Sequence, residues 1–424
     1  MKKLILFTII LLAAATFISC KKQKAIPEAA NSGMANAFLK SAEKSQEEAQ
    51  AVQAEAPEQK EALYKTTMRR GFKMGAVISY QNALKSAYTD MIKADFNSIT
   101  ASNEFKAYSL LNQGASMKSE NGMPVMNYSQ ADTIAKFAQE NGIGIRGHVL
   151  VWDAYMPDWF FREGYTKANG FVDSETMKKR LEYYIDEVVS HFETNFPGVV
   201  YCWDVVNEAV ADSTNECKPD DERRVRTSRS GTTNFFYDVI GPDYVELAFK
   251  YARNAVNKVN PDIKLFYNDY NTFYSPKREA IGKLIQSINK HEKLCDGVGM
   301  QGYVGGYGQQ SGCMNSNDIN LFKNAINFYG KMGLEVHVTE LALRNYEKEQ
   351  AAKHEAFYEN FFRMLAAANS EETYLTSVSI WGLTDNPSLP KSDYSYKMNG
   401  PYCGIYLYNL KKKPEFYRII KALQ

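Results

Sequence analysis

The chain has 424 residues, and its 50 Lys and Arg residues nearly balance its 49 Asp and Glu residues, which leaves a formal net charge of +1. The basic residues are dispersed, so no electrostatic field steers a nucleic acid, and we expect no nucleic-acid partner. Residues 63–424 are dense in aromatic side chains, and this length exceeds that of a small sandwich but suits one barrel domain with extended loops.

The first twenty residues have the pattern of an export signal. Two lysines precede an apolar run that ends at Ile18, and Ser19 precedes Cys20, as in a bacterial lipoprotein signal. The apolar run of about fifteen residues is short for a membrane span, which needs about twenty. Phe17 stands where such signals often have Leu, and a plain signal peptide cut elsewhere is the alternative. We expect an exported protein of the bacterial cell envelope, an outer-membrane lipoprotein anchored only through lipid on Cys20.

Residues 21–62 differ sharply from the rest of the chain. They are rich in Ala, Glu, Gln and Lys and have almost no aromatic residues, which predicts a solvated polar tether. The composition changes at about residue 63, where we expect the folded domain to begin.

The cysteines and histidines do not form a metal-binding pattern. No CxxC or HExxH spacing occurs, so we expect no metal site. Cys217 and Cys313 lie in polar segments and are a candidate disulfide pair in an oxidising compartment. Apart from Cys20, the cysteines are Cys202, Cys217, Cys295, Cys313 and Cys403.

Short β-prone runs alternate along the chain with amphipathic segments of helical period. This alternation predicts parallel strands joined by crossover helices, and eight repeats favour an α/β fold of the (β/α)8 TIM-barrel type over an open sheet. A polar excursion over residues 212–234 is expected to be a long loop on the catalytic face. The expected strands are Phe72–Ile78, Phe96–Ala101, Gly142–Trp152, Val199–Val206, Ile263–Asn268, Gly297–Gln301, Glu335–Glu340 and Ser377–Gly382. The expected helices include Met177–Phe192, Asp243–Val259, Lys277–His291 and Glu347–Ala368.

Two of these strands end in a glutamate. The run EVHVTELA places Glu340 at the C-terminal end of its strand, and VVYCWDVVNEAV runs into Asn207 and Glu208. Barrels of this type keep their chemistry at that end of the strands. Glycoside cleavage requires two carboxyl groups there, one protonated to release the leaving oxygen and one ionised to attack or stabilise the anomeric carbon. For either glutamate alone, a salt-bridged or helix-capping carboxylate explains the pattern equally well.

Polar and aromatic residues follow nearly every other strand. Taken singly, each has a plain structural explanation: a tryptophan as core, a lysine as surface charge, a histidine as a hydrogen-bonded core residue. Together they predict a cleft with aromatic faces for sugar rings and with donors for hydroxyl groups. The candidate binding residues are Asn103, Lys106, His148, Trp152, Asn207, Tyr270, Gln301, Tyr303 and Trp381.

At these positions the chain resembles the family-ten glycoside hydrolases, the endo-β-1,4-xylanases, over essentially all of residues 64–424. The resemblance implies a (β/α)8 barrel and a retaining double displacement, and we expect no cofactor. The matching stretches are FNSITASNEFK, IRGHVLVW with PDWF, YCWDVVNEAV, IGPDYVELAFKYAR, KLFYNDYN, DGVGMQGY, EVHVTEL and SIWGLTDNP.

The resemblance assigns roles residue by residue. Glu208 matches the acid/base of the family, Glu340 its nucleophile, and Asn207 the residue that contacts the sugar 2-hydroxyl. Asn103 and Lys106 match contacts one sugar further out. Around the ring that is cleaved, the matching residues are His148, Trp152, Gln301 and Trp381, to which we add Tyr270.

The chain departs from the family pattern mainly at positions that contact the substrate. The family's His and Asp at positions 303 and 342 normally form one hydrogen-bonded chain with the nucleophile, and losing both together indicates a rebuilt network. The departures are Ser102 for Glu, Asp153 for His, Tyr155 for Gln, Tyr303 for His, Ala342 for Asp and Leu389 for Trp.

We therefore expect a retaining endo-β-xylanase that cleaves xylan or xylo-oligosaccharides, decorated ones in particular. One alternative is the same mechanism on another β-glycan. The other is a sugar-binding lipoprotein with an inactive barrel, against which the intact Glu208, Asn207 and Glu340 argue, because a pure binder needs no pair of carboxyl groups.

Overall fold

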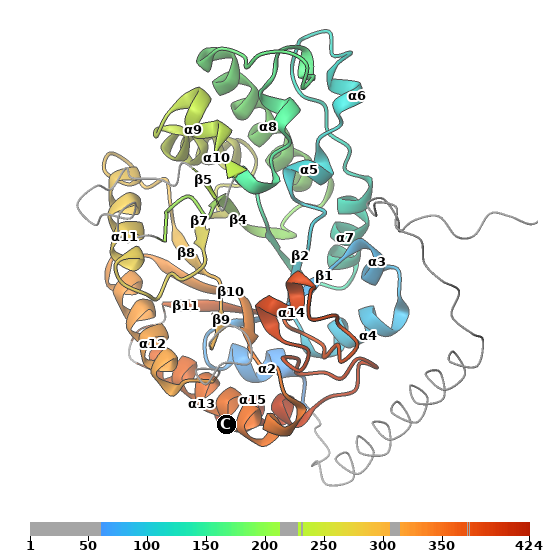
Figure 1. The fold of residues 1–424 in the computed structure, drawn as a ribbon, viewed down its shortest axis with the longest axis vertical. Helices are drawn as coiled ribbons and strands as arrows, with labels where there is room; N and C mark the ends of the chain where they lie inside the picture. The colour runs from blue at the N-terminus through green and yellow to red at the C-terminus, as the bar shows by residue number, and fades with distance from the viewer. Residues whose placement is uncertain (1–60, 213–227, 230–231, 306–313, 371, 373) are drawn as a thin grey trace, which may run out of the picture. The chain divides into compact units, whose positions relative to one another are not determined.

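The computed structural model describes residues 61–212, 228–229, 232–305, 314–370, 372 and 374–424 (Figure 1). The expected signal segment with Cys20, the tether up to residue 60, and most of the loop expected over residues 212–234 lie outside these residues. So do Cys217 and Cys313. In the described part of that loop, β5 (Ser228–Arg229) pairs antiparallel with β6 (Thr232–Thr233).

Eight of the described strands close into a parallel barrel, which confirms the expected (β/α)8 fold. Each strand pairs in parallel with its neighbour, and β11 pairs with both β10 and β1, which closes the ring. The barrel strands are β1 (Lys73–Ile78), β2 (Ser98–Ala101), β3 (Gly144–Gly147), β4 (Val200–Asn207), β7 (Lys264–Asp269), β8 (Gly297–Met300), β10 (Glu335–Leu343) and β11 (Leu375–Ile380). A short strand, β9 (Tyr303–Val304), continues beyond β8 and pairs with the end of β10.

Helices surround the barrel, as Figure 1 shows, and the long ones bury an apolar stripe. In α10, Ala248, Ala252 and Val256 are fully buried at a spacing of four residues, as a helix packed on a sheet requires. The main helices are α4 (Ser86–Asp95), α7 (Ser129–Glu140), α8 (Ser174–Asn195), α10 (Tyr244–Val259), α11 (Lys277–Ile288), α12 (Ser316–Lys331), α13 (Ala351–Ala368) and α15 (Pro414–Leu423). The shorter ones are α2 (Leu63–Met68), α3 (Tyr80–Ala83), α5 (Ala107–Leu110), α6 (Gln113–Ser116), α9 (Phe235–Ile240) and α14 (Tyr394–Asn399). The 3₁₀ helices are η1 (Asp153–Tyr155), η2 (Asp158–Phe161), η3 (Glu163–Tyr165) and η4 (Lys348–Gln350).

Every expected strand overlaps an observed one but differs from it in at least one bound, by one to five residues. The strand expected over Gly142–Trp152 ends its ladder at Gly147, although Val151 rejoins β4 through a single bridge to Val206. The last strand begins at Leu375, two residues before the expected start, because Leu375 pairs with Val336 of β10.

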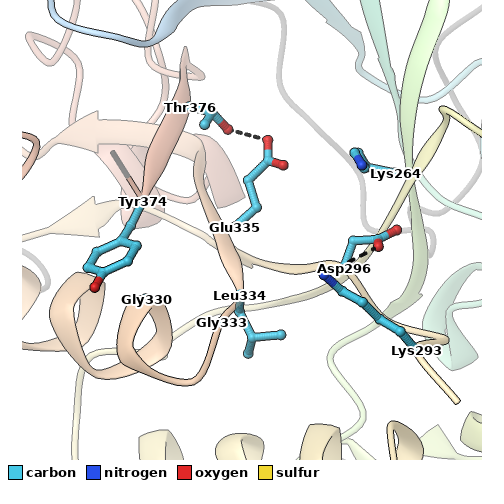
Figure 2. Close-up of a pocket in the computed structure, with 9 residues that line it drawn as sticks. All are labelled: Lys264, Lys293, Asp296, Gly330, Gly333, Leu334, Glu335, Tyr374 and Thr376. Carbon is cyan, nitrogen blue, oxygen red and sulfur yellow. Dashed lines mark hydrogen bonds and ion pairs between the residues drawn. The ribbon is translucent and has the colours of Figure 1, made fainter. Parts of the chain in front are cut away.

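A polar cavity of about 340 Å³ lies at the N-terminal end of the barrel strands (Figure 2). Two interactions lie within it: Lys293 Nζ is 4.0 Å from Asp296 Oδ1, and the Thr376 hydroxyl donates to Glu335. This is the end of β10 opposite Glu340, and in such barrels that end serves stability rather than chemistry. The functional site is therefore expected at the other end.

Candidate active site

Glu208 stands on a tight turn directly after β4. Its φ angle is 56°, in the left-handed region that residues other than glycine rarely adopt. The Glu208 backbone N–H donates to Asn268 O at 2.9 Å, and the next two backbone N–H groups both donate to the Tyr267 hydroxyl, at 3.1 and 3.0 Å. Such a conformation persists only when the surroundings fix it. Here two residues of β7, Asn268 and Tyr267, supply the acceptors that fix it.

The Tyr267 hydroxyl is itself anchored by buried charges. It donates to Asp269 Oδ2 at 2.6 Å, and Asp269 Oδ1 accepts from Lys277 Nζ at 2.8 Å. Burial and the neighbouring Asp269 carboxylate raise the pKa of Tyr267 well above its usual value, so the hydroxyl keeps its proton. The first residue of α11 therefore supports the Glu208 turn through two side chains of β7.

Glu340 lies near the end of β10 and is 8% exposed. The Tyr303 hydroxyl donates to Glu340 Oε2 at 2.6 Å, a short bond of the kind formed with a charged acceptor. Burial and the charge of Glu340 raise the pKa of Tyr303 well above its usual value, so Tyr303 is the donor. Tyr303 pairs across the sheet with Ala342, and the two departures from the family pattern at positions 303 and 342 therefore lie side by side.

The two glutamates are held by one short segment that runs from Gln301, directly after β8, to Tyr303, the first residue of β9. Gln301 Nε2 donates to Glu208 Oε1 at 3.0 Å, while Tyr303 holds Glu340. Residues two apart have Cα atoms at most about 7 Å apart. The charges of both Glu340 and Glu208 raise the pKa of Tyr303, so both carboxyl groups lie near this segment.

Asn207 is oriented by a chain of hydrogen bonds across the strand ends. The Thr339 hydroxyl donates to Asn268 Oδ1 at 2.7 Å, and Asn268 Nδ2 donates to Asn207 Oδ1 at 2.8 Å. Gln301 Nε2 approaches the same oxygen at 3.3 Å. Asn207 Nδ2 is buried without a hydrogen-bond partner among the described residues, so it presents a donor to a ligand.

His148 is fixed by the charged interior of the barrel. Asp204 accepts from Arg146 and, at 2.8 Å, from His148 Nδ1. Burial alone raises the pKa of Asp204, but the charge of Arg146 and the His148 hydrogen bond outweigh it and lower that pKa below its usual value. Asp204 is therefore an ionised acceptor that holds His148 through Nδ1.

Aromatic rings extend from His148 in both directions. Its ring centroid lies 5.9 Å from that of Trp152 and 6.4 Å from that of Trp381. Lys106, which is 5% exposed, donates to Asn103 Oδ1 at 3.1 Å, and its Nζ lies 5.2 Å from the Trp152 ring centroid. These five residues thus form one continuous wall.

Tyr270 occupies a different position from the other candidates. Lys277 Nζ lies 3.7 Å from its ring centroid, so Tyr270 joins the cluster behind the Glu208 turn. The structure thus joins the remaining candidates in two groups, one around the carboxyl pair and one along the aromatic wall.

Several structurally important residues of the site are missing from the sequence predictions. Tyr267 in an apolar strand has the pattern of a core residue, and Thr339 that of an ordinary strand residue. A usable signal existed for Arg146 and Asp204, because a charge inside an apolar strand must find a buried partner.

The described residues contain no group of three or more His, Cys, Asp or Glu side chains arranged to hold a metal ion. Within the same residues, Cys202, Cys295 and Cys403 are buried thiols without a disulfide.

A closed parallel barrel with two glutamates near each other at the carboxyl ends of its strands is the arrangement of a glycoside hydrolase that uses two carboxyl groups. The model of glycosyl hydrolase family 10 matches residues 62–422, and the chain belongs to this family of glycoside hydrolases.

Curated relatives and solved structures agree with this assignment. A putative endo-1,4-beta-xylanase of Caldicellulosiruptor saccharolyticus is 37% identical over 325 residues, which cover 74% of this chain and 95% of that protein. Endo-1,4-beta-xylanase B of Butyrivibrio fibrisolvens is 33% identical over 364 residues, 84% of this chain but only 53% of that longer protein.

Among solved structures, the N-terminal endo-1,4-beta-D-xylanase 10B of Clostridium thermocellum, complexed with xylohexaose, superposes with a TM-score of 0.72 at 27% identity. The match covers 83% of this chain and 66% of that one. The endo-1,4-beta-xylanase of Caldicellulosiruptor owensensis gives a TM-score of 0.68 at 27% identity, with 85% of this chain and 99% of that chain covered.

Proposed function

We propose that this chain is an endo-1,4-β-xylanase that cleaves its substrate by a retaining double displacement. The observation that carries the proposal is the Gln301–Tyr303 segment, which holds Glu208 through one side chain and Glu340 through the other. Retaining glycosidases need their two carboxyl groups about 5–5.5 Å apart, and a pair tied to residues two apart in sequence suits that separation. Xylan is proposed as the substrate because the relatives are named as endo-1,4-beta-xylanases.

Glu208 acts as the acid/base and Glu340 as the nucleophile. In the first step a Glu340 oxygen attacks the anomeric carbon, the glycosidic C–O bond breaks, and Glu208 gives its proton to the departing oxygen. In the second step Glu208 takes a proton from water, whose oxygen displaces Glu340 from the same carbon. Tyr303 binds Glu340 Oε2, which leaves Oε1 for the attack.

The neighbouring residues bind the sugar. The buried Asn207 Nδ2 group donates to the 2-hydroxyl of the ring that is cleaved, beside His148 and Gln301. Trp152 and Trp381 supply faces to that ring, while Asn103 and Lys106 contact the next sugar outward. Both contacts come from the loop after β2, where Lys106 donates to Asn103.

The decisive experiment follows the anomer of the first product by NMR during cleavage of xylohexaose. A β-anomer that later mutarotates is expected, and an α-anomer would mean inversion and overturn the double displacement. A panel of plant polysaccharides tests the polymer. Release of reducing sugar from a β-glucan but not from xylan would favour the second candidate, the same mechanism on another glycan. Xylan binding without release would indicate a sugar-binding protein.

We further propose that decorated xylan is the preferred substrate. Ser102 and Leu389 are smaller than the Glu and Trp of the family pattern, and both are partly exposed, so room is left beside the sugar for acetyl, arabinosyl or uronyl groups. Each hydrogen bond lost to the unbranched chain is worth about 0.5–1.5 kcal/mol. Kinetics on matched linear and substituted oligosaccharides test this, and a clear preference for the linear ones would refute it.

The export signal leads to a proposal about location. The chain is exported and held at the outer membrane as a lipoprotein through Cys20, and the tether over residues 21–62 separates the barrel from the lipid. Among the described residues, no helix is both long and apolar enough to span a bilayer.

A further inference from the structure

The aromatic wall continues past Trp152 to an exposed ring. Tyr155, in η1 after β3, has its ring centroid 4.3 Å from that of Trp152. Tyr108, in α5 after β2, lies 5.4 Å from Tyr155 at an interplanar angle of 40°. The row therefore runs from the ring beside the carboxyl pair outward, across two loops at the same end of the barrel.

Tyr108, at the outer end of this row, is the most exposed of its rings. Trp152 is 8% exposed and Tyr155 is partly buried, whereas Tyr108 is 44% exposed. Lys106 Nζ lies 4.5 Å from the Tyr155 centroid and 5.2 Å from the Trp152 centroid, so the amine that faces the outer sugar stands directly beside the row. An exposed ring continuous with this buried row offers an apolar face to a bound sugar chain.

We infer that Tyr108 and Tyr155 form an additional distal subsite that takes one further pyranose ring of the glycan chain on its non-reducing side. The inference rests on the proposed function, because the direction of the chain follows from the roles of Asn103 and Lys106. The C–H face of a pyranose packs against an aromatic face, and this contact needs no particular hydroxyl group. The family pattern has a glutamine at position 155, which would hydrogen-bond the sugar. In this chain Tyr155 replaces that hydrogen bond with stacking.

Chain-length dependence of the kinetics tests the subsite. In the full chain, kcat/KM is measured on xylotriose, which is too short to reach Tyr108 when cut between its last two units, and on xylohexaose. Tyr108→Ala is expected to lower kcat/KM on xylohexaose, relative to that on xylotriose, by about 3- to 10-fold, the usual size of one aromatic contact. Tyr108→Trp is expected to keep the ratio. Tyr408→Ala is the matched control, because Tyr408 is 71% exposed and lies outside the row, and it should leave both values unchanged.

A second readout separates binding from a general structural defect. With xylohexaose labelled at its reducing end, Tyr108→Ala should move the preferred cleavage point toward the non-reducing end, because one glycone contact is lost. An unchanged length ratio and an unchanged cleavage pattern in Tyr108→Ala would overturn the subsite while leaving the xylanase intact. Failure of the unmodified chain to cleave either oligosaccharide would instead overturn the proposed function, and the subsite with it.

Discussion

Both glutamates depend on donors that keep their protons. Tyr303 holds Glu340 through a hydroxyl whose pKa is raised well above its usual value by burial and by the carboxylate itself. A histidine, which the family pattern has at this position, titrates near neutral pH. The hydrogen bond to Glu340 in this chain therefore persists across the pH range in which a histidine would change its charge.

We predict that Tyr303→Phe lowers kcat by about 10-fold or more, because a hydrogen bond to a charged group is worth about 1.5–3 kcal/mol. The kcat on an aryl xyloside measures the loss of the Tyr303 hydrogen bond to Glu340. Tyr408→Phe is the control, and a kcat of Tyr303→Phe equal to that of the control would contradict the positioning role.

The rate loss on removing Glu208 should be larger for substrates whose leaving group needs protonation. Glu208→Ala is expected to slow hydrolysis of xylan by about 10²–10⁴-fold, the usual contribution of general acid catalysis. An aryl glycoside with a good leaving group needs little protonation, so its first step should lose far less. Pre-steady-state kinetics on both substrates measure the difference. Equal losses on the two would argue against the acid role.

At the scale of elements, the turn after β4 is held by contacts from β7 and α11. Tyr267 accepts two buried backbone N–H groups directly after Glu208, and Lys277 supports it through Asp269. A tyrosine with a raised pKa in the middle of a barrel strand is thus a fixed acceptor for the turn that carries Glu208.

We predict that Tyr267→Phe lowers the free energy of unfolding by about 2–4 kcal/mol, because two buried N–H groups lose their acceptor. It should also lower kcat, since the Glu208 turn relaxes. Urea unfolding and kcat are measured together. Tyr88→Phe is the matched control: the buried Tyr88 hydroxyl donates to Val77 O at 2.8 Å, so its loss should cost stability without an effect on kcat. Equal effects on kcat in both variants would contradict the role of Tyr267 in positioning Glu208.

The other end of β10 has its own charge arrangement, and it predicts a pH effect on stability. Burial alone raises the pKa of Glu335, but hydrogen bonds from His337 and Thr376 and the charges of His337 and Lys264 outweigh it and lower that pKa to about 2. The folded value lies below the unfolded value of 4.5, so Glu335 stabilises the fold above pH 4.5. This contribution is lost as the pH falls from 4.5 toward 2.

Glu335→Gln should therefore flatten the pH dependence of stability in that window. Urea unfolding at pH 7, 4.5 and 3 compares the variant with the parent chain. The variant should be less stable than the parent at pH 7, and the gap between the two should narrow at pH 3. A constant gap at all three values would show that the Glu335 carboxylate does not provide this stabilisation.

At the scale of the whole molecule, the sequence predicts the barrel well because buried parallel strands are short apolar runs. All eight expected strands overlap observed ones. The largest difference in strand bounds is around His148, where the ladder ends at Gly147 although the β-prone pattern continues to Trp152. Pattern alone does not reveal where a strand leaves its ladder.

The site is predictable only in part, and the reason is distance along the chain. Glu208 and Glu340 follow from strand ends, a local feature. The support of Glu208 by Tyr267 joins residues 57 to 58 positions apart, and the Arg146 contact with His337 spans 191 positions. Tyr108 carries no local signal, because its significance comes from a ring on another loop.

The proposed location rests on the N-terminal segment, and Cys20 is the residue that tests it. In a bacterial host, Cys20→Ala should move the protein from the membrane fraction to the soluble one, because the proposed anchor is lipid carried by this cysteine. Ser19→Ala is the matched control, since it keeps a small residue before the cysteine and should leave the protein in the membrane fraction. The released Cys20→Ala protein should cleave soluble oligosaccharides with unchanged kcat, because every candidate active-site residue lies beyond the tether. Membrane retention of Cys20→Ala equal to that of the parent chain would instead favour an ordinary signal peptide and another means of attachment.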